Sequence, residues 1–558
     1  MNEEYNYRFF GCMLDCSRNA VMTVDSIKKW IDISSDIGYN MLMLYTEDTY
    51  EIKSQPYFGY GRGRYSVAEL KELNCYAKSK GIELIPCIQT LAHLNQIVRW
   101  PAYAEHIDQK DILLVGDDEV YNLIEDMFDT VCDCYSSEYI HVGMDEAHGL
   151  GRGKYYDIHG DNNGSQILID HLKRVSEIGK KHGKKLCIWA DMFYRLIAGG
   201  KYNDLPAEID KSICEQIPDN VELVYWDYYS TNIERYDNRI KSHNRIKDGT
   251  WFAGAFRSWW GFAPHNAYSI KATAAAVTAC RNNNVKDMMF TIWGDDGAEC
   301  SKFSLLPSLF YTSELIKGNN DDTDIKLKFE KKFGISFDDF MLLDLPFSPN
   351  GERVSNGICD RTRYNGDDSG LFNSEKYLLY NDLFAGLMDS TLTGNEAEGF
   401  AKCAEELKKH ENNAEWGYLF CSAKALCEVL TVKCDLGQRT RKAYSSGDKS
   451  ELICLIHDYE KLLKRLDNFY NAYREQWYKE NKGQGFEVQD IRLGGLKQRT
   501  AHCKKMLEDY ISGKTERIDE LEEKLLDYKG NGEEFQKKPV MENHWGRIVS
   551  ANLLGQKF

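Results

Sequence analysis

The first 300 residues contain eight short apolar runs, and each run ends in polar, acidic or aromatic side chains. The runs are apolar at successive positions, which is typical of parallel strands that are covered on both faces. They are Phe9–Asp15, Tyr39–Asp48, Ile82–Gln89, Tyr139–Glu146, Lys185–Met192, Val221–Tyr228, Thr250–Phe256 and Asp287–Asp296.

Segments with the apolar period of an amphipathic helix lie between several of these runs. They are Val24–Ile37, Val67–Lys80, Val120–Cys134, Ile167–His182 and Ile270–Asn282. Strands that alternate with helices form parallel βαβ units. Eight such units predict an α/β fold, a closed (β/α)8 TIM barrel, whose active site would lie at the C-terminal ends of the strands.

A different pattern follows the polar stretch that begins near Gly318. No proline occurs between Pro349 and Pro539, and long runs such as Lys449–Glu480 and Leu496–Tyr528 carry the pattern of amphipathic helices. We therefore predict a barrel domain over residues 1–317 and a mainly helical C-terminal domain over residues 318–558.

Two segments of the second region have separate predictions. The tail, Val540–Leu554, regains a short apolar pattern and is expected to return to the core as a strand. The segment Gly483–Gly495, with Asp490 and Arg492, is expected to interrupt the helices. It could then approach a pocket or a second subunit, so a homodimer is one expectation.

Composition excludes several classes of protein. The formal net charge of -17 argues against nucleic acid, which favours a basic surface. No run approaches the roughly 20 apolar residues of a membrane span, and the acidic start, Met1–Glu4, does not resemble a secretory signal. Many of the 17 cysteines lie inside apolar segments, which favours free thiols in a reducing, cytoplasmic setting. The cysteine spacing gives no zinc motif.

The ends of the predicted strands collect acids, tryptophans and an arginine. Strand four ends in the adjacent acids Asp145 and Glu146, and Arg18 follows strand one. Tryptophans near these acids suit a carbohydrate, because the apolar face of a sugar packs on indole while carboxylates and arginine bind its hydroxyls. The remaining candidates at strand ends or in the following loops are His93, Trp189, Tyr225, Asp227, Trp259, Trp293 and Asp295.

The adjacent acids do not fit the usual two-carboxylate arrangement of a glycosidase. Retention needs carboxyl groups about 5 Å apart across the scissile bond, and inversion needs about 6.5–9.5 Å. On a regular strand Asp145 and Glu146 would point to opposite faces. They can serve one pocket if the chain leaves the strand at Glu146, which the downstream glycines permit.

At this point the chain resembles a known family. His141–Glu146 resembles the His-x-Gly-Gly-Asp-Glu signature of family 20 β-N-acetylhexosaminidases. Gly11–Arg18 is similar to the family's strand-one motif, and Trp189 stands where strand five has its pocket tryptophan. Tyr225–Asp227 is similar to the Tyr-x-Asp of strand six, and Trp293–Asp295 to the Trp-x-Glu of strand eight. The resemblance extends over about the first 300 residues.

The resemblance implies a retaining exo-acting enzyme that releases terminal β-linked GlcNAc or GalNAc. The substrate's own 2-acetamido oxygen would attack the anomeric carbon. Glu146 would protonate the leaving oxygen and later activate water, and Asp145 would orient the acetamido group. Tyr225 would hydrogen-bond the acetamido oxygen. The resemblance implies no metal and no organic cofactor.

The resemblance also implies a set of sugar contacts, with some departures. Trp189 and Trp293 would wall the sugar, and Arg18, Asp227 and Asp295 would hold its hydroxyls. His93 and Trp259 complete the predicted binding site, although His93 follows Leu91-Ala92 where Pro-Gly is common. Met144 replaces the usual second glycine, and Asp295 is one methylene shorter than the usual glutamate.

Each of these residues also has a simpler, structural interpretation that competes with its functional one. The acid pair could be a solvated turn, the aromatic residues could be core residues, and Trp259 could pack against the helical domain. Arg18 could form a structural ion pair with Asp15 or Glu47. Two alternative functions also stay open: a related substrate-assisted hydrolase that acts on protein-linked GlcNAc, and a sugar-binding barrel without turnover.

Overall fold

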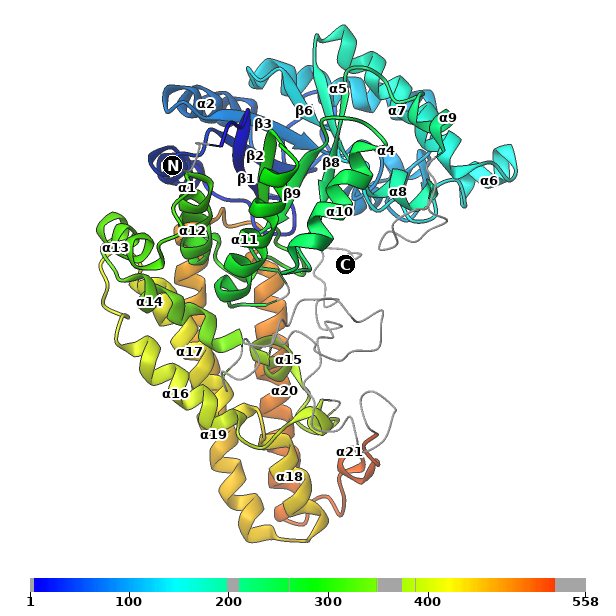
Figure 1. Ribbon diagram of the computed structural model, residues 1–558. Coiled ribbons are helices and arrows are strands. Elements are labelled where there is room, and N and C mark those ends of the chain that lie inside the picture. Colours follow the sequence, from blue (N-terminus) through cyan, green and yellow to red (C-terminus); the bar gives the residue numbers. More distant parts are fainter. Residues whose placement is uncertain are drawn as a thin grey trace.

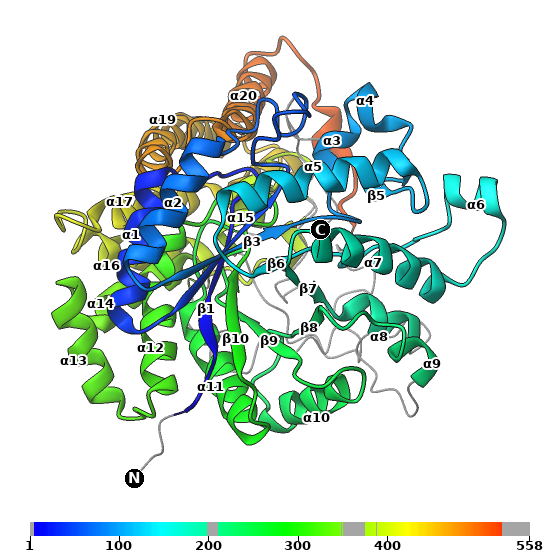
Figure 2. The same ribbon diagram turned by 90° about the horizontal axis from the view of Figure 1, so that it is seen from above.

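The computed structural model describes residues 5–526 except for 198–209, 260, 348, 350–373 and 387. Eight parallel strands form a closed barrel, and β1 pairs with both β2 and β10 to close it. The predicted TIM barrel is therefore confirmed (Figures 1 and 2). Its strands are β1 (Phe9–Asp15), β2 (Met41–Glu47), β3 (Glu83–Ile88), β6 (Tyr139–His141), β7 (Lys185–Trp189), β8 (Val221–Trp226), β9 (Trp251–Ala255) and β10 (Asp287–Ile292).

The helices around the barrel start and end at local signals in the sequence. Thr23 caps α1 by accepting a hydrogen bond from the backbone of Ser26, and Gly38 ends this helix in the left-handed conformation. Ser66 and Glu69 form a capping box at α2. The main barrel helices are α1 (Val24–Ile37), α2 (Val67–Ser79), α5 (Asp118–Cys134), α7 (Gly164–Lys181), α10 (Ile233–Asn244), α11 (Asn266–Asn282) and α12 (Leu306–Ile316).

Shorter elements lie in the connections. They are α3 (Asn95–Val98), α4 (Pro101–Ala104), the hairpin β4 (Ile107–Gln109) and β5 (Ile112–Leu113), α6 (Lys154–His159), α8 (Asp191–Ile197) and α9 (Lys211–Cys214). Because α3, α4 and the β4–β5 hairpin lie between β3 and α5, β6 rather than β4 is the fourth strand of the barrel.

The barrel interior is packed with side chains, and charged residues close its N-terminal end. Arg8 donates hydrogen bonds of 2.7 Å to both carboxylate oxygens of Asp287 and to Glu222. Its guanidinium also lies over the ring of Trp251 at 5.5 Å. These contacts of Arg8 cover the N-terminal end of the barrel interior.

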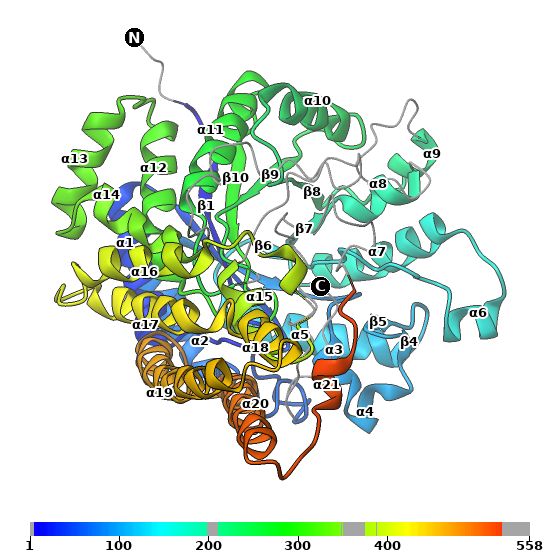
Figure 3. The same ribbon diagram turned by 90° about the horizontal axis from the view of Figure 1, so that it is seen from below.

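The second region is helical and lies beneath the barrel in Figure 1. Seen from below, α16–α20 gather over the side of the barrel that carries α1 and α2 (Figure 3). Its elements are α13 (Asp322–Phe333), α14 (Phe337–Phe340), α15 (Ser374–Tyr380), α16 (Glu396–Lys408), α17 (Gly417–Lys433), α18 (Leu436–Ser445), α19 (Lys449–Glu480), α20 (Phe486–Ile511) and α21 (Asp519–Glu522). The division at residue 317 stays a prediction.

The predicted interruption at Gly483–Gly495 is present but shorter than predicted. The chain is non-helical between the end of α19 at Glu480 and the start of α20 at Phe486, and α20 then runs through Gly494 and Gly495 without a break. Each glycine costs an exposed helix about 1 kcal/mol relative to alanine, but buried residues such as Leu493 and Leu496 anchor the helix on both sides. The predicted strand at Val540–Leu554 lies outside the described residues.

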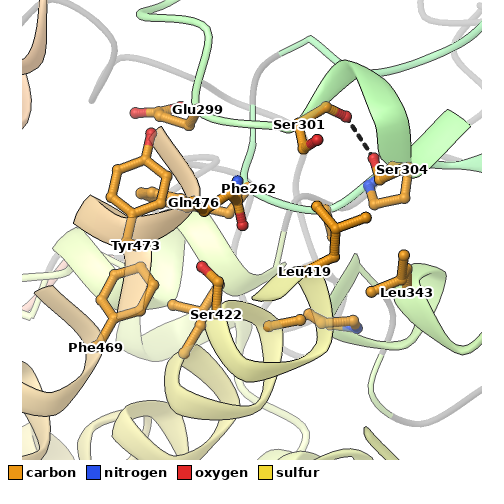
Figure 4. Close-up of a pocket in the computed structure, with 15 residues that line it drawn as sticks. Phe262, Glu299, Ser301, Ser304, Leu343, Leu419, Ser422, Phe469, Tyr473 and Gln476 are labelled. Carbon is orange, nitrogen blue, oxygen red and sulfur yellow. Dashed lines mark hydrogen bonds between the residues drawn. The ribbon is translucent and has the colours of Figure 1, made fainter. Parts of the chain in front are cut away.

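The helical domain contacts the barrel at the loops that follow β1 and β10. Asn19 donates a 2.7 Å hydrogen bond to the carbonyl of Gly485, and Gln489 donates one of 3.2 Å to the carbonyl of Gly297. A small pocket lies near this junction, lined by residues that include Phe262, Glu299 and Tyr473 (Figure 4). Its volume of about 20 Å³ is enough for about one water molecule. No helix in the described part of the chain is both long and apolar enough to cross a membrane.

Candidate active site

The fourth barrel strand is shorter than predicted, and this changes where its acids point. The prediction of a strand over Tyr139–Glu146 is wrong after His141, where β6 ends. Gly143, Met144 and Glu146 then take positive φ angles of 72°, 71° and 48°. A Cβ at Gly143 would lie 2.0 Å from Oε1 of Gln89, so this turn requires glycine.

The turn brings both carboxylates to one histidine. Nε2 of His93 lies 3.2 Å from Oδ2 of Asp145 and 3.9 Å from Oε2 of Glu146. On a regular strand the two acids would face opposite sides of the sheet. The left-handed residues remove that alternation, and the two acids therefore share one site.

Asp145 is held as an ionised carboxylate. Its side chain accepts a 2.7 Å hydrogen bond from Nε2 of Gln89, in addition to the contact with His93. Burial alone would raise the pKa of Asp145, but the charge and hydrogen bond of His93, with Gln89, lower that pKa to about 2. Burial would likewise lower the pKa of His93, and the carboxylate of Asp145 raises it to about 9. The two groups form an ion pair at neutral pH.

Glu146 has a different environment from its neighbour. Its side chain is 26% exposed, whereas that of Asp145 is 11% exposed. The backbone N–H of Glu146 donates a 3.0 Å hydrogen bond to Oδ2 of Asp191. Burial, followed by the charges of Asp145 and Glu146, raises the pKa of Asp191 to about 7. The side chain of Glu146 is thus partly exposed, while its backbone is fixed by the hydrogen bond to Asp191.

Arg18 joins three strand ends. Its Nε donates a 2.9 Å hydrogen bond to Glu47, and its Nη1 donates one of 2.5 Å to Asp295. Burial raises the pKa of both carboxyl groups, although the charge of Arg18 opposes that shift. The ion pair with Glu47 that the sequence left open is present. Asp15 instead accepts a hydrogen bond from the backbone N–H of Arg18.

All three predicted tryptophans belong to the cluster of buried residues inside the barrel. Trp189, Trp259 and Trp293 all pack there, and the rings of Trp189 and Trp293 are 6.2 Å apart. Tyr45 meets Trp293 edge-to-face at 4.9 Å. The indole N–H groups of Trp189 and Trp293 make no hydrogen bond within the described part of the protein. Such donors suit the hydroxyls of a sugar that packs on the rings.

Tyr225 lies apart from this cluster. Its ring belongs to the core between strands and helices, where it stacks on His243 at 4.2 Å. Its hydroxyl donates a 3.0 Å hydrogen bond to Oδ2 of Asp227. Tyr228, three residues later, packs inside the barrel against Trp259 at 5.4 Å. The structure thus separates Tyr225 from the aromatic residues with which it was grouped.

Sequence reasoning missed several polar residues of the site. Tyr45 donates a 3.0 Å hydrogen bond to Glu47 and accepts one of 2.9 Å from Gln89. Strand alternation places Tyr45 and Glu47 on one face, so this pair could have been found. Gln89 ends the predicted third strand, but only the fold shows that it faces Asp145. In the described ranges, no cluster of three or more His, Cys, Asp or Glu side chains has the geometry of a metal site.

Two family models match the chain. One, described as glycosyl hydrolase family 20, catalytic domain, matches residues 5–242. The other, described as Glycoside Hydrolase 20C C-terminal domain, matches residues 360–541. The two matches fall on the barrel and on the helical region, so together they account for most of the chain.

Curated relatives carry related names. Human Hexosaminidase D is 23% identical over 323 residues, which cover 54% of this chain and 64% of that protein. A Beta-hexosaminidase of Porphyromonas gingivalis is 26% identical over 226 residues, which cover 34% of this chain and 29% of that protein. The alignments thus span less than two thirds of these relatives.

Solved structures with a similar fold include a β-N-acetylhexosaminidase from Bacteroides fragilis. It is 21% identical, has a TM-score of 0.45, and the match covers 59% of this chain and 70% of that one. A chitobiase from Flavobacterium johnsoniae is 15% identical with a TM-score of 0.45, over 84% of this chain and 78% of its own.

Proposed function

The chain belongs to glycoside hydrolase family 20, and we propose that it is a retaining, exo-acting β-N-acetylhexosaminidase. Its substrate is a glycan with terminal β-linked GlcNAc or GalNAc, and the sugar's acetamido group is the nucleophile. One observation carries this proposal: an ionised, fixed Asp145 lies beside a more exposed Glu146, and both contact His93.

In the first step Glu146 donates its proton to the glycosidic oxygen as the acetamido oxygen attacks the anomeric carbon. The bond to the leaving group breaks, and an oxazolinium-like intermediate forms. The deprotonated Glu146 then takes a proton from water, which attacks the anomeric carbon and reopens the ring. Two displacements at one carbon retain its configuration. The partial exposure of Glu146 supports this role.

Asp145 has the complementary role in the proposal. As a carboxylate with a low pKa, it orients the acetamido N–H and stabilises the positive charge that develops on nitrogen. His93 and Gln89 fix its two oxygens, so it keeps one direction throughout the reaction. A fixed charge needs no reorganisation in the transition state, which is why it accelerates the reaction.

The remaining residues hold the sugar. Trp189, Trp259 and Trp293 form its apolar wall, and Arg18, Asp295 and Asp227 bind hydroxyls. We assign the hydrogen bond to the acetamido oxygen to Tyr228 instead of Tyr225, because Tyr228 is packed with Trp259 inside the barrel. Tyr225 then supports Asp227 through its hydroxyl.

A panel of aryl glycosides tests the proposal. We expect the protein to release the aryl group from β-GlcNAc and β-GalNAc substrates, with at least about 100-fold preference over β-glucoside, because only the former carry the nucleophile. Proton NMR of the first product should show the β-anomer. An initial α-anomer, a trapped glycosyl ester on a side chain, or equal rates on glucosides would contradict the mechanism.

The setting of the enzyme is also part of the proposal. The sixteen cysteines in the described ranges are free, and most are buried, which supports a reducing, cytoplasmic location. The reaction as written uses no cofactor. A homodimer is an expectation that sedimentation velocity would test directly.

A further inference from the structure

The loop after β10 has an unusual backbone. Asp296, Gly297 and Ala298 all have positive φ angles, of 66°, 112° and 53°. Side chains with a Cβ rarely adopt this conformation, so two of the three residues are strained. The residue before them is Asp295, whose carboxylate accepts the hydrogen bond from Arg18. The position of Asp295 therefore depends on whatever holds this loop in shape.

Side chains of the helical domain donate several of the hydrogen bonds that fix this loop. Nη1 of Arg492, on α20, donates a 2.5 Å hydrogen bond to the carbonyl of Asp296, and Nζ of Lys376, on α15, donates one of 3.3 Å to the same oxygen. Gln489 donates to the carbonyl of Gly297 at 3.2 Å. The φ of Gly297 favours glycine, and a Cβ there would lie 2.6 Å from Nη1 of Arg492, so the arginine would have to shift.

The same two cations pair with the last acid of the loop. Oε1 of Glu299 accepts from Arg492 at 2.8 Å, and Oε2 accepts from Lys376 at 2.5 Å. The side chains of Arg492 and Glu299 are fully buried, and that of Lys376 is 1% exposed. Figure 4 shows Glu299 at the edge of the pocket, with Tyr473 from α19 pointing toward it.

We propose that the helical domain positions the sugar-binding end of strand β10. Arg492 and Lys376 hold Glu299 and the carbonyl of Asp296, so that Asp295 and Trp293 keep the orientation in which they bind the distal hydroxyls and face of the sugar. Arg492 and Lys376 are positioning residues that do not touch the substrate. The inference rests on the proposed function, because the ligand of Asp295 is the sugar of that proposal.

The ion pairs of Glu299 with Arg492 and Lys376 are buried, and this burial makes them costly to break. A carboxylate between two buried cations is costly to leave unpaired, so the loop cannot move away from α20 without exposing or stranding Glu299. An interdomain contact that served stability alone would need no particular partner in the loop. Here the donors converge on the left-handed residues next to Asp295.

Amide hydrogen exchange of the full chain, measured without substrate, tests whether the helical domain fixes the loop at residues 295–299. In Arg492→Lys the charge is kept, but lysine cannot donate to the carbonyl and to Glu299 with the geometry of a guanidinium. We expect the amides of residues 295–299 to exchange at least about 10-fold faster than in the wild type, because a charged hydrogen bond is lost. Amides of β1 and β2 should be unchanged.

A matched control lies on the same helix. Lys497 is about half exposed and pairs with the exposed Asp467, so Lys497→Met removes a cation of α20 away from the loop. Its exchange pattern at residues 295–299 should equal that of the wild type. Lys376→Gln provides a second variant from another helix, should Arg492→Lys fail to fold. Unchanged exchange in both Arg492→Lys and Lys376→Gln would overturn the inference.

A double-mutant cycle with Asp295→Asn tests whether Arg492 acts through Asp295. Arg492→Lys should raise KM for an aryl β-GlcNAc about 10-fold with little change in kcat, since it disturbs binding that is equal in ground and transition states. The double variant should have a KM no higher than that of Asp295→Asn. Additive effects on KM, or a loss confined to kcat, would contradict the role.

The two proposals fail in different ways. If the wild type does not hydrolyse N-acetylhexosaminides, the proposed function fails, and the exchange experiment still decides whether α20 holds the loop. If the wild type is active but the cycle is additive, the positioning role fails and the proposed function stands. The same double-mutant cycle can be measured without turnover, by using calorimetry to determine the Kd of each variant for N-acetylglucosamine.

Discussion

The two strand ends that would meet the substrate are held in different ways. The end of β6 is held from within the barrel: Gln89 and His93 fix Asp145, and Asp191 fixes the backbone of Glu146. The end of β10 is held both from within the barrel, where Arg18 donates to Asp295 and Asp15 accepts from Gly294, and from outside, by α15 and α20 of the helical domain. The proposed proton chemistry therefore depends on the barrel alone, whereas the proposed sugar binding depends on both domains.

The difference separates two kinds of kinetic effect. Changes at the β6 end remove the groups proposed to act on the reacting atoms, so they should lower kcat. Changes at the β10 end alter the groups proposed to hold distant hydroxyls, so they should raise KM. This division can be tested with variants on each side, and the largest effects belong to the acid pair.

Glu146→Gln should cause the largest loss. General acid catalysis contributes about 10²–10⁴-fold, so hydrolysis of an unactivated disaccharide should fall by that factor, and hydrolysis of an aryl substrate with a good leaving group should fall less. Steady-state kcat on both substrates is the measurement. Near wild-type turnover of the disaccharide would remove Glu146 from its role and break the comparison.

Asp145→Ala should cost about 10²–10³-fold in kcat on aryl β-GlcNAc, because a fixed charge at the developing cation is lost. Aryl β-glucoside, which has no acetamido group, should be affected much less. The ratio of the two rates is the readout. Equal losses on both substrates would argue against assistance by the acetamido group.

His93→Gln should weaken the fold by about 1–3 kcal/mol near neutral pH, because it removes the buried cation that faces the carboxylate of Asp145. The pKa of His93 is raised from 6.5 to about 9, so its contribution is complete below pH 6.5 and is lost as pH rises through 9. The pKa of Asp145 is lowered to about 2, so its contribution is complete above pH 3.8 and is lost toward pH 2.

The check is urea unfolding of the wild type and His93→Gln between pH 6 and pH 10. Their difference in free energy of unfolding should shrink as pH rises toward 9. At the β10 end, arginine keeps its charge over the whole range. A difference that did not depend on pH would show that His93 is not held as a cation.

Asp295→Asn should have the smallest effect, a rise in KM of about 10-fold with kcat nearly unchanged, because it weakens one charged contact to the sugar. Glu146→Gln, assayed in parallel on the same substrate, provides the contrast in kcat. A fall in kcat as large as that of Glu146→Gln would mean that the two strand ends are not separable in function.

Much of the fold could be predicted because a strand that is buried on both faces has apolar residues at successive positions. The bounds of β1, α1 and α19 agree with the predicted ranges, since caps and apolar period mark them. The end of β6 could not be predicted, because Met144 and Glu146 adopt left-handed angles that their side chains disfavour. Only tertiary contacts, such as those of Gln89 and Asp191, impose that turn.

The site was predicted less completely for a related reason. Tyr225 and Tyr228 are close in the chain, but Tyr225 belongs to the core outside the strands and Tyr228 to the cluster inside the barrel. A sequence motif does not show which of the two side chains points inward. Arg492 and Gln489 were placed in an interruption of the helices, yet they lie on α20 and reach a loop about two hundred residues earlier. Such distant pairings leave no local signal.

That last pairing has a consequence for how the protein is made. Glu299 and Arg492 are 193 residues apart, so a chain emerging from the ribosome completes its barrel well before α20 is synthesised. Domains generally fold as units in the order of synthesis. The newly made barrel therefore carries the proposed proton-transfer residues early, and the proposed sugar-binding end of β10 gains its contacts with α15 and α20 only when the last third of the chain has been made.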